Sequence, residues 1–282
     1  MLDAAVNADL VEEIRTEIEN ETLQLPTLPE VALQIRDAVE SENTDANTIA
    51  TMVAMDPALS ARLLQVANSP LYRGRAEIDS IQQAVTRLGL KSVRSLVVSL
   101  AMKQMFQATS AALDTQFRNV WDDSLQVAAI SRVLAGSVAE LEKEQAMLGG
   151  LVHNIGALPL LTKIDERFGF TAGETVVAHM IDEFAPSIGA RILKHWRFSD
   201  TLANIPTACH DLKHDPGPTP SYADVVLVAR LQNLSAKSSR GAEAGWPEIP
   251  AFAKIGMEPE VLIVDMEGPA EEIAGVRSML EG

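Results

Sequence analysis

The sequence predicts an all-α protein built of many helices. Apolar residues recur at helical spacing along most of the chain, whereas the alternation that marks strands is weak everywhere. The apolar run at residues 261–264 is β-like, but it is short and isolated. Apolar residues make up 47% of the chain and aromatic residues only 4%, so Leu, Ile, Val, Ala and Met fill most of the expected core, as they do between packed helices.

Residues 1–107 show several helices with clear boundaries. Asp56 stands before Pro57, and Ser80 stands three residues before Gln83, which are start signals of the N-cap and capping-box kinds. Two prolines within residues 25–30 predict a stiff extended connector. The expected helices span residues 9–22, 29–40, 45–55, 56–68, 80–88 and 91–107. The last of these is apolar nearly all round, so we expect it to be buried.

The second half of the chain continues the helical pattern. The expected helices span residues 115–138, 158–164, 174–184, 186–196, 200–211 and 222–234, followed by two or three short ones. Pro186 marks a helix start in this interpretation, and Pro206 kinks the helix that contains it. A loop rich in Gly and Ser, ending near Pro247, precedes the final short helices.

An apolar run at residues 147–156 carries one imidazole and one amide, His153 and Asn154. The pair Gly149–Gly150 weakens a helix interior, so it predicts a close backbone approach by a neighbouring element. Gly156 is interpreted as a C-terminal helix stop. His153 and Asn154 then occupy the last turn of a buried helix, where each needs a hydrogen-bonding partner. They are either a hydrogen-bonded core histidine beside a capping amide or the remains of a metal site.

The composition argues against several classes of function. A formal net charge of −16 disfavours general affinity for nucleic acids, which requires clustered Lys and Arg. Cys209 is the single cysteine, so neither an internal disulfide nor a zinc site of several thiolates can form. The N-terminus does not resemble a signal peptide, and no stretch approaches the roughly 20 apolar residues of a membrane span. We therefore expect a cytoplasmic protein that binds neither membranes nor nucleic acid.

Several short motifs follow one another in a recognisable order. They are residues 25–29 (LPTLP), 56–59 (DPAL), 64–69 (LQVANS), 88–89 (LG), 121–125 (WDDSL), 149–156 (GGLVHNIG), 188–190 (IGA) and 209–210 (CH). Over roughly residues 20–235 the chain resembles the HDOD family, the HD-related output domain of bacterial signalling proteins. The resemblance implies an N-terminal helical lobe packed on an HD-phosphohydrolase-like helical lobe. We accordingly expect lobes at residues 1–110 and 111–235 and a helical C-terminal tail at 236–282.

The resemblance also implies where a metal site would lie. HD phosphohydrolases are named for a His-Asp doublet that, with further His and Asp residues, binds one or two divalent metals and activates water against a phosphate ester. Here the doublet is His153-Asn154, the family's upstream histidine falls at Asp123, and its His-His pair is Cys209-His210. Arg230 lies near the expected final aspartate. We therefore read His153, Asn154, Asp123 and His210 as a vestigial HD site without catalytic residues.

Each of these residues also has a purely structural interpretation. His153 fits a satisfied core histidine, Asp123 a solvated helix residue, and His210 a polar helix end running into the loop at His214. Cys209 is expected to be a small buried apolar side chain rather than a nucleophile.

The substituted ligand positions favour a non-catalytic signalling protein that acts through protein–protein interaction. No cofactor is expected, and any metal would be a weakly held divalent ion on His153, Asp123 and His210. The expected partner is an unidentified signalling protein in a separate chain. Two alternatives remain open: a metal-dependent phosphohydrolase with an altered site, and a binder of a small phosphorylated or nucleotide signal. Arg73 and Arg75 either contact a partner or an anion or belong to an ordinary solvated loop.

Overall fold

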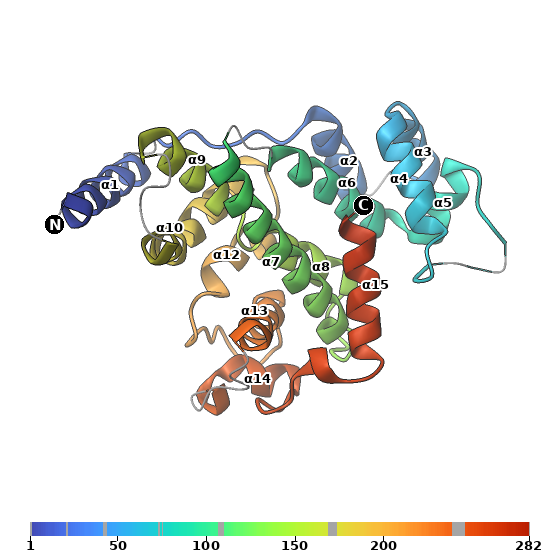
Figure 1. Cartoon of the computed structure of the whole chain (residues 1–282). Coiled ribbons are helices and arrows are strands. Elements are labelled where there is room, and N and C mark those ends of the chain that lie inside the picture. The colour runs from blue at the N-terminus through green and yellow to red at the C-terminus, as the bar shows by residue number, and fades with distance from the viewer. Residues whose placement is uncertain are drawn as a thin grey trace.

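The computed structural model describes residues 2–20, 22–41, 44–72, 74, 76–106, 110–168, 174–238 and 246–281. Within these ranges the chain forms α-helices and two short 3-10 helices, and it forms no strand (Figure 1). The all-α prediction is therefore confirmed. Arg73, Arg75 and the greater part of the expected Gly/Ser-rich loop lie outside the described residues.

Most helices of the N-terminal part begin where the sequence signals a start, but the first spans Leu2–Glu19 instead of the predicted residues 9–22. The helices of this part are α1 (Leu2–Glu19), α2 (Glu30–Glu40), α3 (Ala46–Ala54), α4 (Pro57–Ala67), α5 (Ile81–Leu88) and α6 (Leu90–Met105). The Asp56 carboxylate accepts hydrogen bonds from the N–H groups of Ala58 and Leu59 at 2.8 and 3.1 Å. The Ser80 hydroxyl accepts one from the N–H of Gln83 at 3.2 Å. Both predicted starts are confirmed, and α6 is buried along most of its length, as expected.

The second part is organised around one long helix, α7, which crosses the centre of Figure 1. Helices α8, α9, α13 and α15 all pack against α7. The elements of this part are α7 (Ala111–Ala135), α8 (Lys143–Val152), α9 (Ala157–Phe168), α10 (Glu174–His195), α11 (Asp200–Ala203), α12 (Ile205–Ala208), α13 (Tyr222–Ser238), η1 (Trp246–Glu248), α14 (Pro250–Ile255), η2 (Ile263–Asp265) and α15 (Pro269–Glu281).

Two predicted helix boundaries near prolines are wrong. Residues 174–195 form a single helix, α10, with Pro186 inside it, because packing against α9, α11 and α12 outweighs the backbone donor that proline lacks. The kinked helix expected around Pro206 is two short helices, α11 and α12, separated at Asn204. The β-like run at residues 261–264 forms no strand, and η2 begins within it.

Glycines at two positions bring helices into close contact. A Cβ at Gly150 would lie 2.7 Å from the Cα of Ala128 on α7, which confirms the predicted close approach. Gly156 is not the predicted helix stop, because α8 already ends at Val152. A Cβ at Gly156 would lie 2.0 Å from the carbonyl oxygen of Ala185, so this glycine allows α10 to pack on the turn at residues 153–156.

The C-terminal helix α15 joins the two parts of the molecule. It packs along α7, and Figure 1 shows its end beside α6. Its buried side chains are Ile273, Val276, Met279 and Leu280. The guanidinium of Arg62 on α4 donates to the carbonyl of Met279, and the ammonium of Lys103 on α6 donates to the carbonyl of Glu281. The tail is thus part of the packed fold.

One segment of the described chain, Lys143–Glu166, is long and apolar enough to cross a membrane by length and composition. It consists of α8, the turn that follows and most of α9. Of its most apolar window, 78% is buried inside the protein. Most side chains of that window therefore contribute to the core.

Candidate functional site

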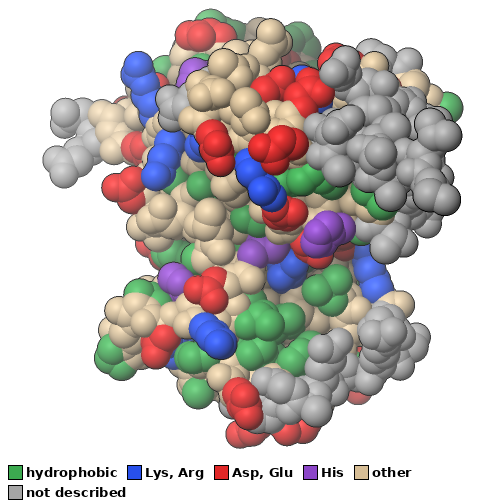
Figure 2. All heavy atoms as spheres, turned by 90° about the vertical axis from the view of Figure 1, so that its left-hand side faces the viewer, with side chains coloured by type: hydrophobic (Ala, Val, Ile, Leu, Met, Phe, Trp, Pro, Cys, Tyr) green, Lys and Arg blue, Asp and Glu red, His purple; other side chains and the backbone are tan. Residues whose placement is uncertain are grey.

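A cavity of about 400 Å³ lies between α7, α10 and α13, with the turn after α8 and the end of α12 completing its lining. All four residues of the predicted vestigial site, His153, Asn154, Asp123 and His210, line this one cavity. Seen from the left-hand side of Figure 1, histidine, basic and acidic side chains gather in a hollow across the middle of the molecule (Figure 2). The sequence motifs, though distant along the chain, therefore converge in space.

His153 follows α8 directly and is only 3% exposed. Its Nδ1 lies 2.6 Å from the carbonyl oxygen of Gly150, so Nδ1 carries the proton and donates it to that carbonyl. Nε2 is consequently left as a lone-pair acceptor. Burial lowers the pKa of His153 to about 4, and the charge of Arg230 acts in the same direction. The ring is therefore neutral at pH 7.

His210 follows α12 and repeats this arrangement. Its Nδ1 lies 2.8 Å from the carbonyl oxygen of Pro206, and its ring stacks on that of His153 with centroids 6.5 Å apart. Burial lowers the pKa of His210 to about 3, with a further contribution from Arg230. Within the described part of the chain, neither Nε2 atom has a hydrogen-bonding partner. The pocket thus holds two neutral imidazoles with free acceptor nitrogens.

Asn154 lies beside His153 in the turn. Its side-chain oxygen is buried and has no hydrogen-bonding partner among the described residues. An amide has the shape of a carboxylate but not its negative charge, so Asn154 adds no attraction for a cation. A buried acceptor without a partner costs about 1–3 kcal/mol, which a donor placed in the pocket would offset.

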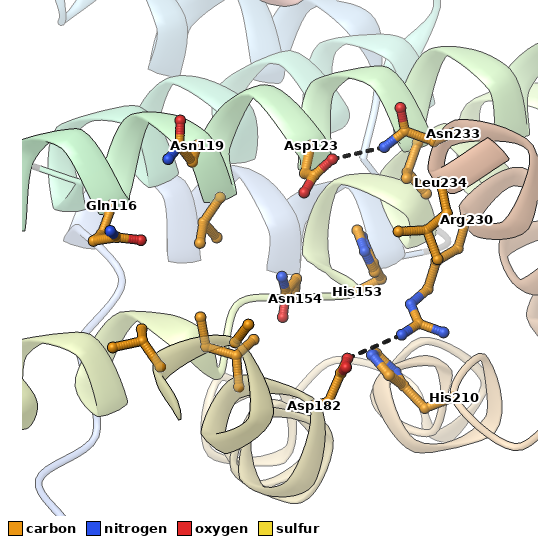
Figure 3. Close-up of a pocket in the computed structure, with 15 residues that line it drawn as sticks. Gln116, Asn119, Asp123, His153, Asn154, Asp182, His210, Arg230, Asn233 and Leu234 are labelled. Carbon is orange, nitrogen blue, oxygen red and sulfur yellow. Dashed lines mark hydrogen bonds and ion pairs between the residues drawn. The ribbon is translucent and has the colours of Figure 1, made fainter. Parts of the chain in front are cut away.

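Asp123 on α7 is engaged by α13. Its Oδ1 accepts a hydrogen bond from Nδ2 of Asn233 at 2.7 Å (Figure 3). The same oxygen forms an ion pair with Lys237. Two groups of α13, one of them a cation, therefore contact the same carboxylate oxygen of Asp123.

Arg230 and Asp182 are the pocket residues that sequence reasoning missed. Arg230 extends from α13 toward His210 and pairs with Asp182 of α10 at 3.2 Å (Figure 3). In the sequence, Arg230 indicates only that the expected final aspartate is absent. A basic residue near that position also indicates a positive charge in the pocket. The pairing was not foreseeable, because Asp182 was expected near the end of a shorter helix.

Cys209 is fully buried, and burial raises the pKa of its thiol to about 12. A nucleophilic thiolate is therefore unavailable near neutral pH. His179 lies on the exposed side of α10, with its Nε2 3.7 Å from Glu183, and does not line the cavity.

The comparisons with known proteins match this architecture. A model of the HDOD domain matches residues 25–212. The chain belongs to the HDOD domain family. A curated relative of this HDOD protein, an uncharacterised protein of Treponema pallidum, is 24% identical over 258 residues, which is 84% of this chain and 47% of the relative. The chain therefore spans about half the length of that relative.

Solved structures share the fold of this HDOD protein over nearly its whole length. A protein of Shewanella amazonensis, for which a metal-dependent phosphohydrolase activity has been suggested, has a TM-score of 0.83 and 26% identity, with 99% of this chain and 100% of that one covered. A protein of Marinobacter aquaeolei, suggested to act in signal transduction, has a TM-score of 0.70 and 20% identity, with 99% and 66% covered.

The HDOD pocket does not fit a catalytic divalent metal. The two Nε2 atoms are suitable nitrogen ligands, but the carboxylates in the described lining, Asp123 and Asp182, are paired with Lys237 and Arg230. Among the described residues no group of three or more His, Cys, Asp or Glu side chains is placed to hold a metal ion. A guanidinium beside the rings also repels a cation.

Proposed function

We propose that this HDOD protein is a non-catalytic signalling protein that acts in the cytoplasm by binding another protein. The observation that carries the proposal is the position of Arg230, a fixed cation in the pocket where HD phosphohydrolases use acidic metal ligands. Loss of a single supporting partner typically lowers metal affinity or activity about 10–100-fold. The combined changes at Asn154, Asp123 and Arg230 should therefore abolish metal-dependent hydrolysis.

The intact framework supports a role that depends on the shape of the protein. The buried apolar residues form one cluster that runs from α1 to α15 and includes α7, α8 and α13. A chain with this packing but without the acidic metal ligands can still use its surface and its pocket for binding. The suggested signalling role of the Marinobacter aquaeolei protein agrees with this reading.

The charge of the chain indicates the kind of partner. With 39 acidic and 23 basic side chains, the protein attracts surfaces of opposite sign. We expect the partner to present a basic contact surface, so the association rate should fall as ionic strength rises.

A hydrolysis assay tests the non-catalytic assignment. The full chain, purified without chelator, is incubated with a chromogenic phosphodiester and a phosphomonoester in Mn²⁺, Fe²⁺ or Mg²⁺, alongside His153→Ala. Because a working acidic ligand set is missing, both proteins should give the same background. Metal-dependent turnover that disappears in His153→Ala would instead establish an altered phosphohydrolase.

A further inference from the structure

We propose that the Arg230 pocket binds a small hydroxylated phosphomonoester, which the protein retains without hydrolysing it. The proposal rests on the non-catalytic function proposed for the same site. A volume of about 400 Å³ is in the usual range for small-molecule pockets, roughly 300–1,000 Å³. The walls combine apolar side chains, such as Val177 and Ile181 of α10, with the convergent polar groups described above.

The Arg230 side chain is suited to bind a phosphate. The guanidinium of Arg230 has donors for bidentate binding of an anion, and its side chain is 18% exposed. Its present partner Asp182 is 68% exposed, and exposed ion pairs are weak. A phosphomonoester carries about −1.5 to −2 charges at pH 7, so it can displace the singly charged carboxylate of Asp182 from Arg230. A carboxylate on a ligand would carry only the same charge as Asp182.

The part of the pocket beside Arg230 requires hydrogen-bond donors. The Nδ1 protons of His153 and His210 are held by backbone carbonyls, so both Nε2 atoms can only accept. The buried Oδ1 of Asn154 is a third acceptor without a partner among the described residues. Hydroxyl groups would satisfy these acceptors, whereas a second anionic group would be repelled by their lone pairs.

The guanidinium and the three acceptors together select the ligand class. A divalent metal ion would be repelled by the positive charge of Arg230. A simple inorganic anion would leave the three acceptors without good donors. A neutral sugar could not displace Asp182 from its ion pair with Arg230. A molecule that carries a phosphate and neighbouring hydroxyl groups satisfies both. Figure 3 shows the Arg230 side chain extending toward His210, with His153 and then Asn154 farther along the lining.

Calorimetric titration of the full chain tests the proposal. The probes are ribose 5-phosphate, glycerol 3-phosphate and adenosine 5′-monophosphate, with ribose and inorganic phosphate as partial ligands. We expect at least one phosphomonoester to bind saturably at one site and more tightly than either partial ligand. If no phosphomonoester binds, or inorganic phosphate binds equally well, the proposal is overturned.

Three variants locate the binding. Arg230→Gln should weaken it about tenfold or more, because a charge-assisted pair is lost. Asp182→Asn should strengthen it, because the competing carboxylate is removed. Arg118→Gln, at an exposed arginine paired with Asp114, should leave it unchanged. Thermal unfolding verifies that each variant is folded, and an affinity unaltered by Arg230→Gln or lowered by Asp182→Asn would refute the assignment.

Measurement of inorganic phosphate in the titrated samples distinguishes a failure of the ligand proposal from a failure of the non-catalytic function. Inorganic phosphate released from a bound phosphomonoester would contradict the non-catalytic function. Absence of binding would refute only the ligand proposal and leave the hydrolysis result untouched.

Discussion

The imidazole rings of His153 and His210 stack with their centroids 6.5 Å apart and their planes inclined by 22°. They follow different helices, α8 and α12, and each donates its Nδ1 proton to a backbone carbonyl of its own segment. Both rings are therefore held in the tautomer that leaves Nε2 free. The pocket keeps the nitrogen half of a metal site without the acidic half.

The buried histidines make stability depend on pH. The folded pKa values of His153 and His210 are about 4 and 3, against 6.5 for an ordinary histidine. Between pH 6.5 and 4 the unfolded chain binds more protons, so the free energy of unfolding should fall as the pH falls through this interval. At about 1.4 kcal/mol per pKa unit, His153 alone accounts for about 3 kcal/mol.

Urea unfolding at pH 7.5 and 4.5 measures this dependence. His153→Gln should reduce the dependence without abolishing it, because one of the two groups that take up a proton on unfolding is gone and His210 remains. His179→Asn, at an exposed position, should retain the wild-type slope. An unchanged slope in His153→Gln would show that other groups cause the loss.

Gly150→Ala should destabilise the fold. The added methyl would lie 2.7 Å from the Cα of Ala128 and 2.9 Å from Ser131 Oγ, so α8 must move away from α7. Such overpacking typically costs about 1–3 kcal/mol. Gly275→Ala in α15 is the matched control: its methyl meets nothing within 4 Å, and it should stabilise by about 0.5–1 kcal/mol. Equal unfolding midpoints for the two variants would rule out the close helix approach.

The tail helix should contribute to global stability. Met279 of α15 is only 4% exposed, so Met279→Ala should lower the free energy of unfolding by about 2–5 kcal/mol. Met266→Ala, at a side chain that is 46% exposed, should change it by less than about 0.5 kcal/mol. Chemical denaturation of both variants gives the comparison, and a neutral Met279→Ala would mean that α15 adds little.

Local signals predicted much of this fold, and contacts between distant segments account for the rest. Asp56 and Ser80 start helices because a cap needs only its own neighbours. Pro186 breaks no helix, since its cost is outweighed by three helices that no local pattern reveals. Gly156 was read as a stop but is required by contact with Ala185. These errors share one cause, which is packing between elements far apart in the sequence.

The lining residues of the candidate site could be predicted, but their ion pairs could not. Resemblance to a family pointed to His153, Asn154, Asp123 and His210, which all line one cavity. It could not show that Lys237 pairs with Asp123 or that Asp182 pairs with Arg230, because ion pairs between helices depend on their relative placement.

Restoring acidic groups tests the electrostatic argument. Asn154→Asp alone should give little affinity for Mn²⁺, because Arg230 still places a positive charge beside the histidines. The double variant Asn154→Asp/Arg230→Asp should bind Mn²⁺ more tightly in calorimetric titration, because it removes the repulsion and adds two carboxylates. Equal affinity in the single and double variants would show that Arg230 does not exclude the metal.

The metal content of the wild-type protein is the most direct test of the account. Elemental analysis of the full chain, purified without chelator and compared with His153→Ala, gives the molar ratio of Mn, Fe, Zn and Mg to protein. Since the pocket carries Arg230 and lacks an unpaired carboxylate, each ratio should lie far below one and be the same in both proteins. A ratio of one metal per chain that falls in His153→Ala would contradict the central claim.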